Sequence, residues 1–144
     1  MITDNKPLVV EHIYKASPTR VWEAITDIEQ MRKWYFPDLD GFCPEVGFKF
    51  TFSGNSDCGE YIHDCVVTEV EPGSKITYSW SYRNYPGMSY VTWDLYPHEG
   101  GTLLVLTHKG LETFPQDLRD FTRESFTGGW TYFLNEALPK FFDE

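Results

Sequence analysis

The residues best suited to chemistry in this sequence are aromatic side chains that recur with a period of two. In ITYSWSY, at positions 76 to 82, Ile76, Tyr78, Trp80 and Tyr82 alternate with small hydroxyl residues. Residues two apart share one face of a β-strand, so these side chains form a row. The row could pack into a solid core, contact a partner or line a hollow for a small molecule. Inward polar tips favour the hollow, because a buried Tyr hydroxyl or Trp N–H needs a hydrogen-bond partner.

A histidine is the second candidate for chemistry. His108 ends the apolar run TLLVLTH, whose inner face is hard to assign because the run is almost continuously apolar. An inward His108 could hydrogen bond to a ligand carbonyl or phenol, and an imidazole can change charge near neutral pH. A core histidine that is satisfied by other protein groups is the more common alternative.

Signatures of common enzyme and metal sites are missing from the sequence. It contains no G-x-S-x-G, H-E-x-x-H, Walker A or Rossmann glycine pattern. Cys58, His63 and Cys65 lie close together, but no second Cys/His pair follows at a ligand spacing, and a zinc site usually needs four ligands. DLDG, at 38 to 41, lacks the remaining ligands of a calcium loop and is interpreted as a surface loop. We predict no catalytic residue, no metal site and no cofactor, and leave enzymatic activity open.

Composition restricts the classes of partner. The chain has 144 residues, 41% of them hydrophobic and 24% charged, which is typical of one globular domain over residues 1–144. Its 22 acidic and 12 basic residues give a formal charge of -10, which repels nucleic acid and anionic membranes. No signal segment is visible, and no apolar run approaches the roughly 20 residues that span a bilayer. We therefore expect a cytoplasmic protein without a nucleic-acid or membrane partner.

Periodicity and turn residues indicate the elements that position the aromatic row. LVVEHIYKA, at 8 to 16, is predicted to be a strand, and Ser17 and Pro18 are suited to cap and begin a helix. A second short helix is predicted for IEQMRKWYF. From VGFKFTF onward the period is two, and short turn clusters predict antiparallel hairpins. These clusters lie at 53–59, 71–74, 84–87 and 98–101.

The C-terminal segment returns to helical spacing. Its apolar residues follow steps of three and four: Phe126, Trp130, Phe133, Leu134, Ala137, Leu138 and Phe141. Pro139 removes a hydrogen bond, so we expect the helix to kink or end near Leu138. Gly128 and Gly129 each cost about 0.8 to 1 kcal/mol inside a helix. Either they mark its start, or they make room where the helix crosses the sheet.

This order of elements resembles the helix-grip architecture of the START-like (SRPBCC) superfamily. Four segments, ASPTRVWEAITD, VTEVEPGSKITYSW, VTWDLYPHEGGTLLVLTHKG and GGWTYFLNEAL, are similar to the family named after the activator of the heat shock protein 90 ATPase. The resemblance implies an α+β fold with a curved antiparallel six-stranded sheet wrapped around a long C-terminal helix. Two short helices would lie between the first and second strands. It also implies a cavity between sheet and helix.

That implied cavity defines the predicted ligand-binding set. Its members are Trp34, Phe50, Phe52, Tyr78, Trp80, Trp93, His108, Trp130 and Leu134. Small-molecule pockets are mostly apolar with a few polar groups, and this set has that character. We predict that the protein binds a small hydrophobic or aromatic molecule, such as a lipid-, flavonoid- or polyketide-like compound.

The resemblance leaves two other functions open. One is contact with a chaperone, although the founding activators carry a separate N-terminal domain that 144 residues do not accommodate. The other is a polyketide cyclase-like enzyme, in which His108, Tyr78 and Asp64 would move protons. Tyr90 and Tyr96, expected on the outer face of their strand, would support a homodimer.

Overall fold

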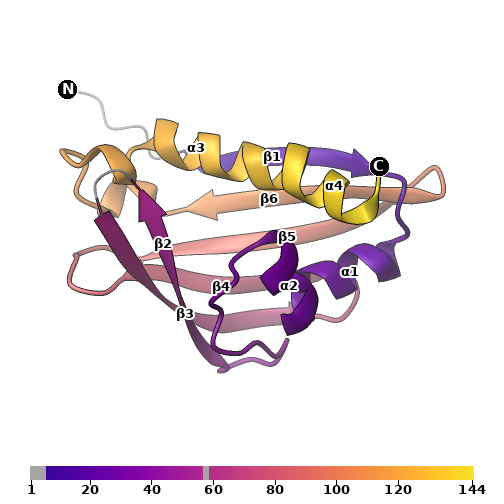
Figure 1. The fold of residues 1–144 in the computed structure, drawn as a ribbon, viewed down its shortest axis with the longest axis horizontal. Helices are drawn as coiled ribbons and strands as arrows, with labels where there is room; N and C mark the ends of the chain where they lie inside the picture. The colour runs from indigo at the N-terminus through magenta and orange to yellow at the C-terminus, as the bar shows by residue number, and fades with distance from the viewer. Residues whose placement is uncertain (1–5, 57–58) are drawn as a thin grey trace.

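Six antiparallel strands form one curved sheet whose concave side holds the helices (Figure 1). The structure is a computed structural model that describes residues 6–56 and 59–144. The strands are β1 (Leu8–Tyr14), β2 (Lys49–Ser56), β3 (Gly59–Glu71), β4 (Lys75–Tyr82), β5 (Ser89–His98) and β6 (Gly101–Lys109). The helices are α1 (Pro18–Thr26), α2 (Ile28–Trp34), α3 (Arg123–Tyr132) and α4 (Leu138–Phe142), with short helical segments η1 (Leu111–Thr113), η2 (Arg119–Phe121) and η3 (Phe133–Ala137). This arrangement confirms the predicted helix-grip fold.

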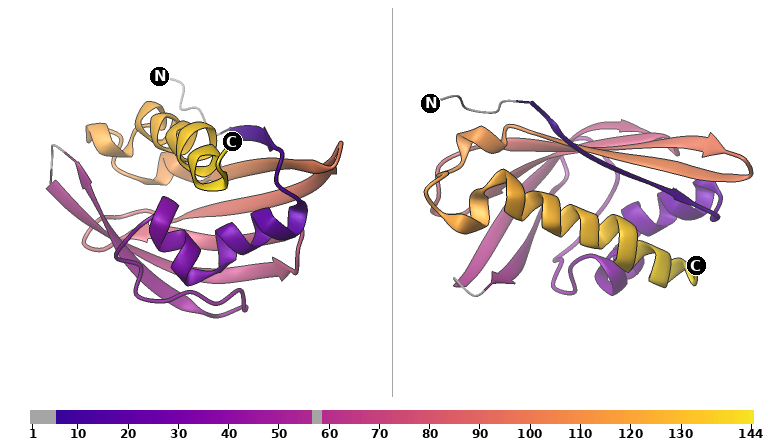
Figure 2. Two further views of the ribbon diagram at one scale, coloured as in Figure 1. Left: turned by 45° about the vertical axis from the view of Figure 1, so that its right-hand side comes forward. Right: turned by 90° about the horizontal axis from the view of Figure 1, so that it is seen from above.

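The sheet has the order β1-β6-β5-β4-β3-β2, so the first strand closes beside the last. The register of β3 against β4 shifts between Val67 and Glu69, and such a bulge increases the local twist. Figure 2 shows the C-terminal helix lying across the concave side, with α1 and α2 beside its final part. No helix in the described part of the chain is long and apolar enough to cross a membrane.

The predicted strand faces are confirmed. Tyr78 and Trp80 of β4 and Trp93 of β5 are buried, and the uncertain inner face of β6 includes His108. Tyr90 and Tyr96 lie on the outer face and are about half exposed, at 45% and 50%. The periodicity of two therefore predicted which side of the sheet each ring occupies.

The DLDG loop covers the free edge of β2. Asp40 accepts a hydrogen bond from the backbone amide of Thr51 at 2.8 Å, and Asp38 accepts one from the amide of Ser53 at 2.8 Å and another from its hydroxyl. Burial raises the pKa of Asp38, but the bonds from Ser53 outweigh it and leave the pKa below its usual value. Because an open strand edge can pair with another chain, these carboxylates protect the edge.

The C-terminal helix passes through Pro139 by widening. In the π-helical segment η3 the Leu138 amide donates to the carbonyl of Phe133, five residues back. The following hydrogen bond of this pattern would run from the amide of residue 139 to the carbonyl of Leu134. Pro139 has no amide hydrogen, so this bond cannot form. The Tyr14 hydroxyl of β1 donates to that carbonyl at 2.6 Å. Helical structure therefore continues beyond Leu138, where the sequence predicted a kink or an end.

The two helix glycines have neither of the predicted roles. Gly128 and Gly129 lie inside α3, which begins at Arg123 after the N-cap Thr122. A Cβ atom added at either glycine would meet nothing within 4 Å, so close approach of helix and sheet does not require them. Gly129 instead borders an open space beside the helix.

The bond from Tyr14 to Leu134 is testable by substitution. We expect Tyr14→Phe to lower the free energy of unfolding by about 1 to 3 kcal/mol, because it leaves a buried carbonyl unpaired. In a Pro139→Ala background the restored amide can donate to a carbonyl of this turn. Tyr14→Phe should then lower the free energy of unfolding by a smaller amount. Urea unfolding of the four proteins in a double-mutant cycle measures the difference. Equal costs in both backgrounds would contradict this account of the π-helical segment.

Candidate functional site

Part of the predicted ligand-binding set lies in a closely packed interior. Trp93 Nε1 donates to the Tyr78 hydroxyl at 3.0 Å, which in turn lies 3.0 Å from the hydroxyl of Tyr35. Trp34 Nε1 donates to the carbonyl of Ala24 at 2.7 Å. Every buried side-chain nitrogen or oxygen in the described chain has a hydrogen-bond partner. In this part of the interior the Tyr hydroxyl and Trp N–H groups form hydrogen bonds with other protein groups, so they do not require a hollow. Burial raises the pKa of Tyr35 and Tyr78, which keeps both phenols protonated.

His108 is fully buried, and both of its ring nitrogens are used. Trp130 Nε1 lies 3.0 Å from His108 Nδ1, and Ser89 Oγ lies 2.8 Å from His108 Nε2 and 2.8 Å from the carbonyl of Trp80. An indole nitrogen can only donate, so Nδ1 accepts and Nε2 carries the proton. The bonds therefore run from Trp130 to His108, from His108 to Ser89 and from Ser89 to Trp80. His108 cannot accept the proton of Ser89, so this pair is not an activated nucleophile.

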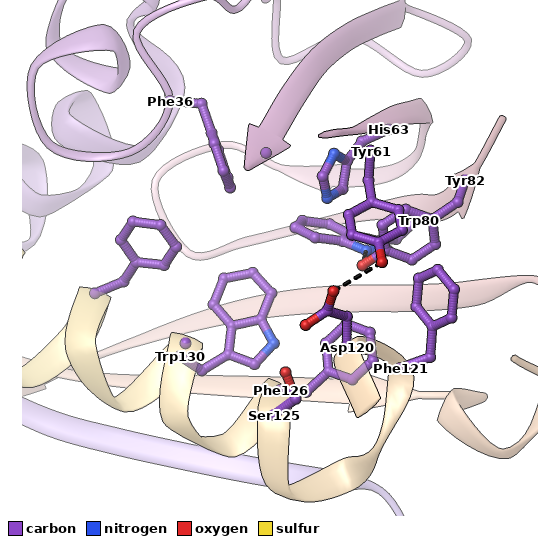
Figure 3. A pocket seen from close by; sticks show the side chains of 13 residues that line it. Phe36, Tyr61, His63, Trp80, Tyr82, Asp120, Phe121, Ser125, Phe126 and Trp130 are labelled. Atoms are coloured by element: carbon purple, nitrogen blue, oxygen red, sulfur yellow. Dashed lines mark hydrogen bonds between the residues drawn. The ribbon is translucent and has the colours of Figure 1, made fainter. Parts of the chain in front are cut away.

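A cleft of about 230 Å³ opens at the other end of the concave side, between the β2–β3 hairpin, η2 and α3 (Figure 3). Its apolar wall consists of the rings of Phe36, Trp80, Phe121, Phe126, Trp130 and Phe133. Its polar groups belong to Tyr61, His63, Tyr82, Asp120 and Ser125, and the remaining lining residues are Gly54 and Gly129. The cleft thus combines an aromatic wall with a few polar atoms, as small-molecule sites do.

Two predicted residues, Trp80 and Trp130, line this cleft. The others pack behind it or farther along the interior: Trp34, Phe50, Phe52, Tyr78, Trp93, His108 and Leu134. Phe52 supports the cleft from behind, because its ring stacks on Phe36 at 4.1 Å and on His63 at 4.4 Å between centroids. The structure therefore brings together only part of the predicted set.

Several lining residues were not predicted. Tyr82 continues the inward row of β4, and Tyr61 and His63 alternate in β3, so a period of two was available as a signal for all three. Gly129 stands four residues after Ser125 and four before Phe133, on one stripe of the C-terminal helix. The lining residues of η2, by contrast, lie in the irregular segment between β6 and α3. This segment has no sequence periodicity from which their position could be predicted.

A hydrogen bond joins two of the elements that line the cleft. The Tyr61 hydroxyl of β3 donates to Asp120 Oδ2 of η2 at 2.7 Å, the dashed line in Figure 3. Among the described lining residues none is Lys or Arg, and Asp120 is the one carboxylate. Together with the net charge of -10, this surrounding disfavours an anionic ligand.

The described residues offer no metal centre. Nowhere in residues 6–56 and 59–144 do three His, Cys, Asp or Glu side chains gather as a metal ion would require. His63 lies in the cleft and Cys65 is buried, while Cys58 lies outside the described residues.

His63 lies in the cleft wall, where its ring is beside the backbone carbonyls of Phe52 and Tyr61. It is 5% exposed, and its Nδ1 lies 3.2 Å from the carbonyl of Phe52, to which it must donate because a carbonyl only accepts. Burial lowers the pKa of His63 to about 4 and that of His108 to about 3. Both imidazoles are therefore neutral at pH 7.

These lowered pKa values predict a loss of stability in mild acid. An unfolded histidine takes up a proton near pH 6.5, whereas the folded His63 and His108 do so only near pH 4 and 3. Their neutral forms support the fold fully above pH 6.5, and this support declines as the pH falls. Between pH 7 and 5 each should reduce the free energy of unfolding by about 2 kcal/mol.

Urea unfolding at pH 7 and pH 5 measures this decline. We expect the free energy of unfolding of His63→Phe to fall by about 2 kcal/mol less than that of the unmodified protein, because the variant lacks one of the two histidines. The two pH values lie above the range in which most carboxylates titrate, which limits their contribution. An identical decline in both proteins would show that His63 is not held neutral by the fold.

Comparison with known proteins places this architecture in a family. The family model described as activator of Hsp90 ATPase homolog 1-like protein matches residues 15–143. No protein of curated function matches the chain. Among solved structures, protein MLL2253 from Mesorhizobium loti is 28% identical, with a TM-score of 0.76 over 96% of this chain and 97% of that one.

Two further structures show the same relationship. CalU16 from Micromonospora echinospora is 27% identical, with a TM-score of 0.73 over 94% of this chain and 74% of that one. Protein BH1534 from Bacillus halodurans is 26% identical, with a TM-score of 0.72 over 94% and 96% of the two chains. The resemblance predicted from the sequence is thus confirmed, and the chain belongs to the family of activator of Hsp90 ATPase homolog 1-like proteins.

Proposed function

We propose that the protein binds a small aromatic molecule in the cleft between the β2–β3 hairpin, η2 and α3. The observation that carries the proposal is the aromatic wall of the cleft, in which the rings of Trp80 and Trp130 lie 5.3 Å apart and are 4% and 2% exposed. A ligand that enters the cleft buries its own apolar surface against these rings, and this burial is a source of binding free energy. Family membership is compatible with such a role.

The volume of the cleft narrows the ligand class. A cavity of about 150 Å³ accommodates benzene, and drug-sized ligands occupy pockets of about 300 Å³ or more. At about 230 Å³, the cleft suits a compound of one or two rings. A long-chain lipid or a large polyketide would extend beyond the cleft, so within the predicted class of small hydrophobic or aromatic molecules we favour compounds of one or two rings.

No comparable observation in the described residues supports the two alternative functions, a cyclase-like enzyme and a chaperone contact. His108 and Tyr78, considered for proton transfer in a cyclase-like enzyme, do not line the cleft, and Asp64 forms an exposed ion pair with Arg83 at 2.7 Å. Nothing specific in the described residues favours a chaperone contact. Association through the outer face with Tyr90 and Tyr96 stays a prediction.

Adjacent helix glycines provide a matched test of the site. Gly129 lines the cleft and Gly128 does not, while a Cβ atom at either position meets nothing within 4 Å. We expect Gly129→Leu to place its side chain in the cleft and weaken the binding of 2-naphthol by about tenfold or more, and Gly128→Leu to leave binding within about twofold. Both substitutions also favour the helix by roughly 0.8 kcal/mol, so a loss of stability does not explain the difference.

Titration of 2-naphthol against an isotopically labelled sample, followed by amide chemical shifts, gives both affinity and location. The largest shifts should fall in β3, β4 and α3. Saturable binding that survives in Gly129→Leu, or shifts centred on another surface, would overturn the proposal.

A further inference from the structure

His63 and Tyr82 lie side by side in the wall of the cleft. They are direct partners in the register of β3 and β4, and their ring centroids are 4.6 Å apart (Figure 3). The two strands hold them from the backbone, and the ring of Phe52 supports His63 from behind. Their polar atoms therefore have a fixed spacing, as a recognition site requires.

His63 presents a hydrogen-bond acceptor. Its Nδ1 proton goes to the carbonyl of Phe52, so in the neutral ring Nε2 carries a lone pair. No described group donates to Nε2, and every fully buried polar side-chain atom in the described chain has a partner. Nε2 is therefore not sealed inside the protein, and since the ring lines the cleft, we place this acceptor at the cleft surface.

Tyr82 presents a hydrogen-bond donor. Its hydroxyl oxygen accepts a bond from Trp80 Nε1 at 2.8 Å. The indole nitrogen has no acceptor capacity, so the hydroxyl proton of Tyr82 must point elsewhere, and no described group accepts it. Burial raises the pKa of Tyr82, which keeps this proton in place at neutral pH.

From this pair we infer that the cleft recognises the hydroxyl group of a neutral ring compound, which donates its proton to His63 Nε2 and accepts the proton of Tyr82. The inference rests on the proposed function and names its ligand class, the phenols. A hydroxyl group satisfies both residues at once, whereas an ether oxygen or a carbonyl can only accept from Tyr82. A carboxylate would face the lone pair of His63 and the charge of Asp120, without a Lys or Arg among the described lining residues.

Three probes that share one ring system test the inference: 2-naphthol, 2-methoxynaphthalene and 2-naphthoate. We expect 2-naphthol to bind about tenfold more tightly than 2-methoxynaphthalene, as one or two additional hydrogen bonds would provide, and 2-naphthoate to bind most weakly. Affinities come from the same chemical-shift titration at pH 7. Equal affinities for the first two probes would overturn the inference and leave the aromatic site standing.

Substitutions then assign the preference to the two residues. His63→Phe keeps a ring but removes the lone pair, while His63→Asn keeps a donor for the Phe52 carbonyl and removes the acceptor at Nε2. Tyr82→Phe removes the donor. Each should reduce the preference for 2-naphthol to about twofold or less, and the exposed Tyr96→Phe should retain it.

The outcomes separate the two proposals. If 2-naphthol stays preferred in Tyr82→Phe and in whichever His63 variants fold, as judged by near-ultraviolet circular dichroism, the recognition pair is wrong although the cleft binds. If the unmodified protein binds none of the three probes, the proposed function fails, and the phenol preference fails with it.

Discussion

One buried chain of hydrogen bonds joins the C-terminal helix to three neighbouring strands. It starts at Trp130 of α3, passes through His108 of β6 and Ser89 of β5, and ends at the backbone carbonyl of Trp80 in β4. The donor and acceptor of each hydrogen bond are fixed, because only the tautomer of His108 with its proton on Nε2 can accept from Trp130 and donate to Ser89. Because the group is fully buried, a change in helix position would leave polar atoms unpaired, at a cost of about 1 to 3 kcal/mol each. The chain thereby fixes where the helix lies on the sheet.

This fixed helix divides the concave side into two parts. Toward α2, Tyr35, Tyr78 and Trp93 fill the space and pair their polar tips with one another. Toward the β2–β3 hairpin, Gly129 contributes no side chain, and the space beside the helix stays open. A Cβ atom at Gly54 would lie 3.0 Å from Cε1 of His63, so this second glycine leaves room for the imidazole itself. Both glycines thus determine the shape of the open part, whereas large rings close the other.

The strand faces could be predicted because a period of two assigns each residue to a side of the sheet. The same argument does not tell how far along the sheet a side chain lies, nor which other element covers it. Tyr78 and Trp80 share a face and differ by two positions, yet Tyr35 of the segment after α2 covers the first, while the second borders the cleft. Asp120 depends on an irregular connection whose path follows from tertiary contacts alone. The fold could therefore be predicted almost completely. Of the residues that line the cleft, only Trp80 of the strand pattern and Trp130 of the helix pattern were predicted.

The two buried histidines show what separates a structural residue from a candidate binding residue here. The sequence directed attention to His108, since it ends an apolar strand, and burial holds both imidazoles neutral. The pKa values therefore do not distinguish them. What distinguishes them is the use of the second ring nitrogen: both nitrogens of His108 have protein partners, whereas no described group donates a hydrogen bond to Nε2 of His63. An unused acceptor in an aromatic wall needs a donor from outside the protein, and this need, more than burial or charge, directs the search for a ligand to the end of the sheet where His63 lies.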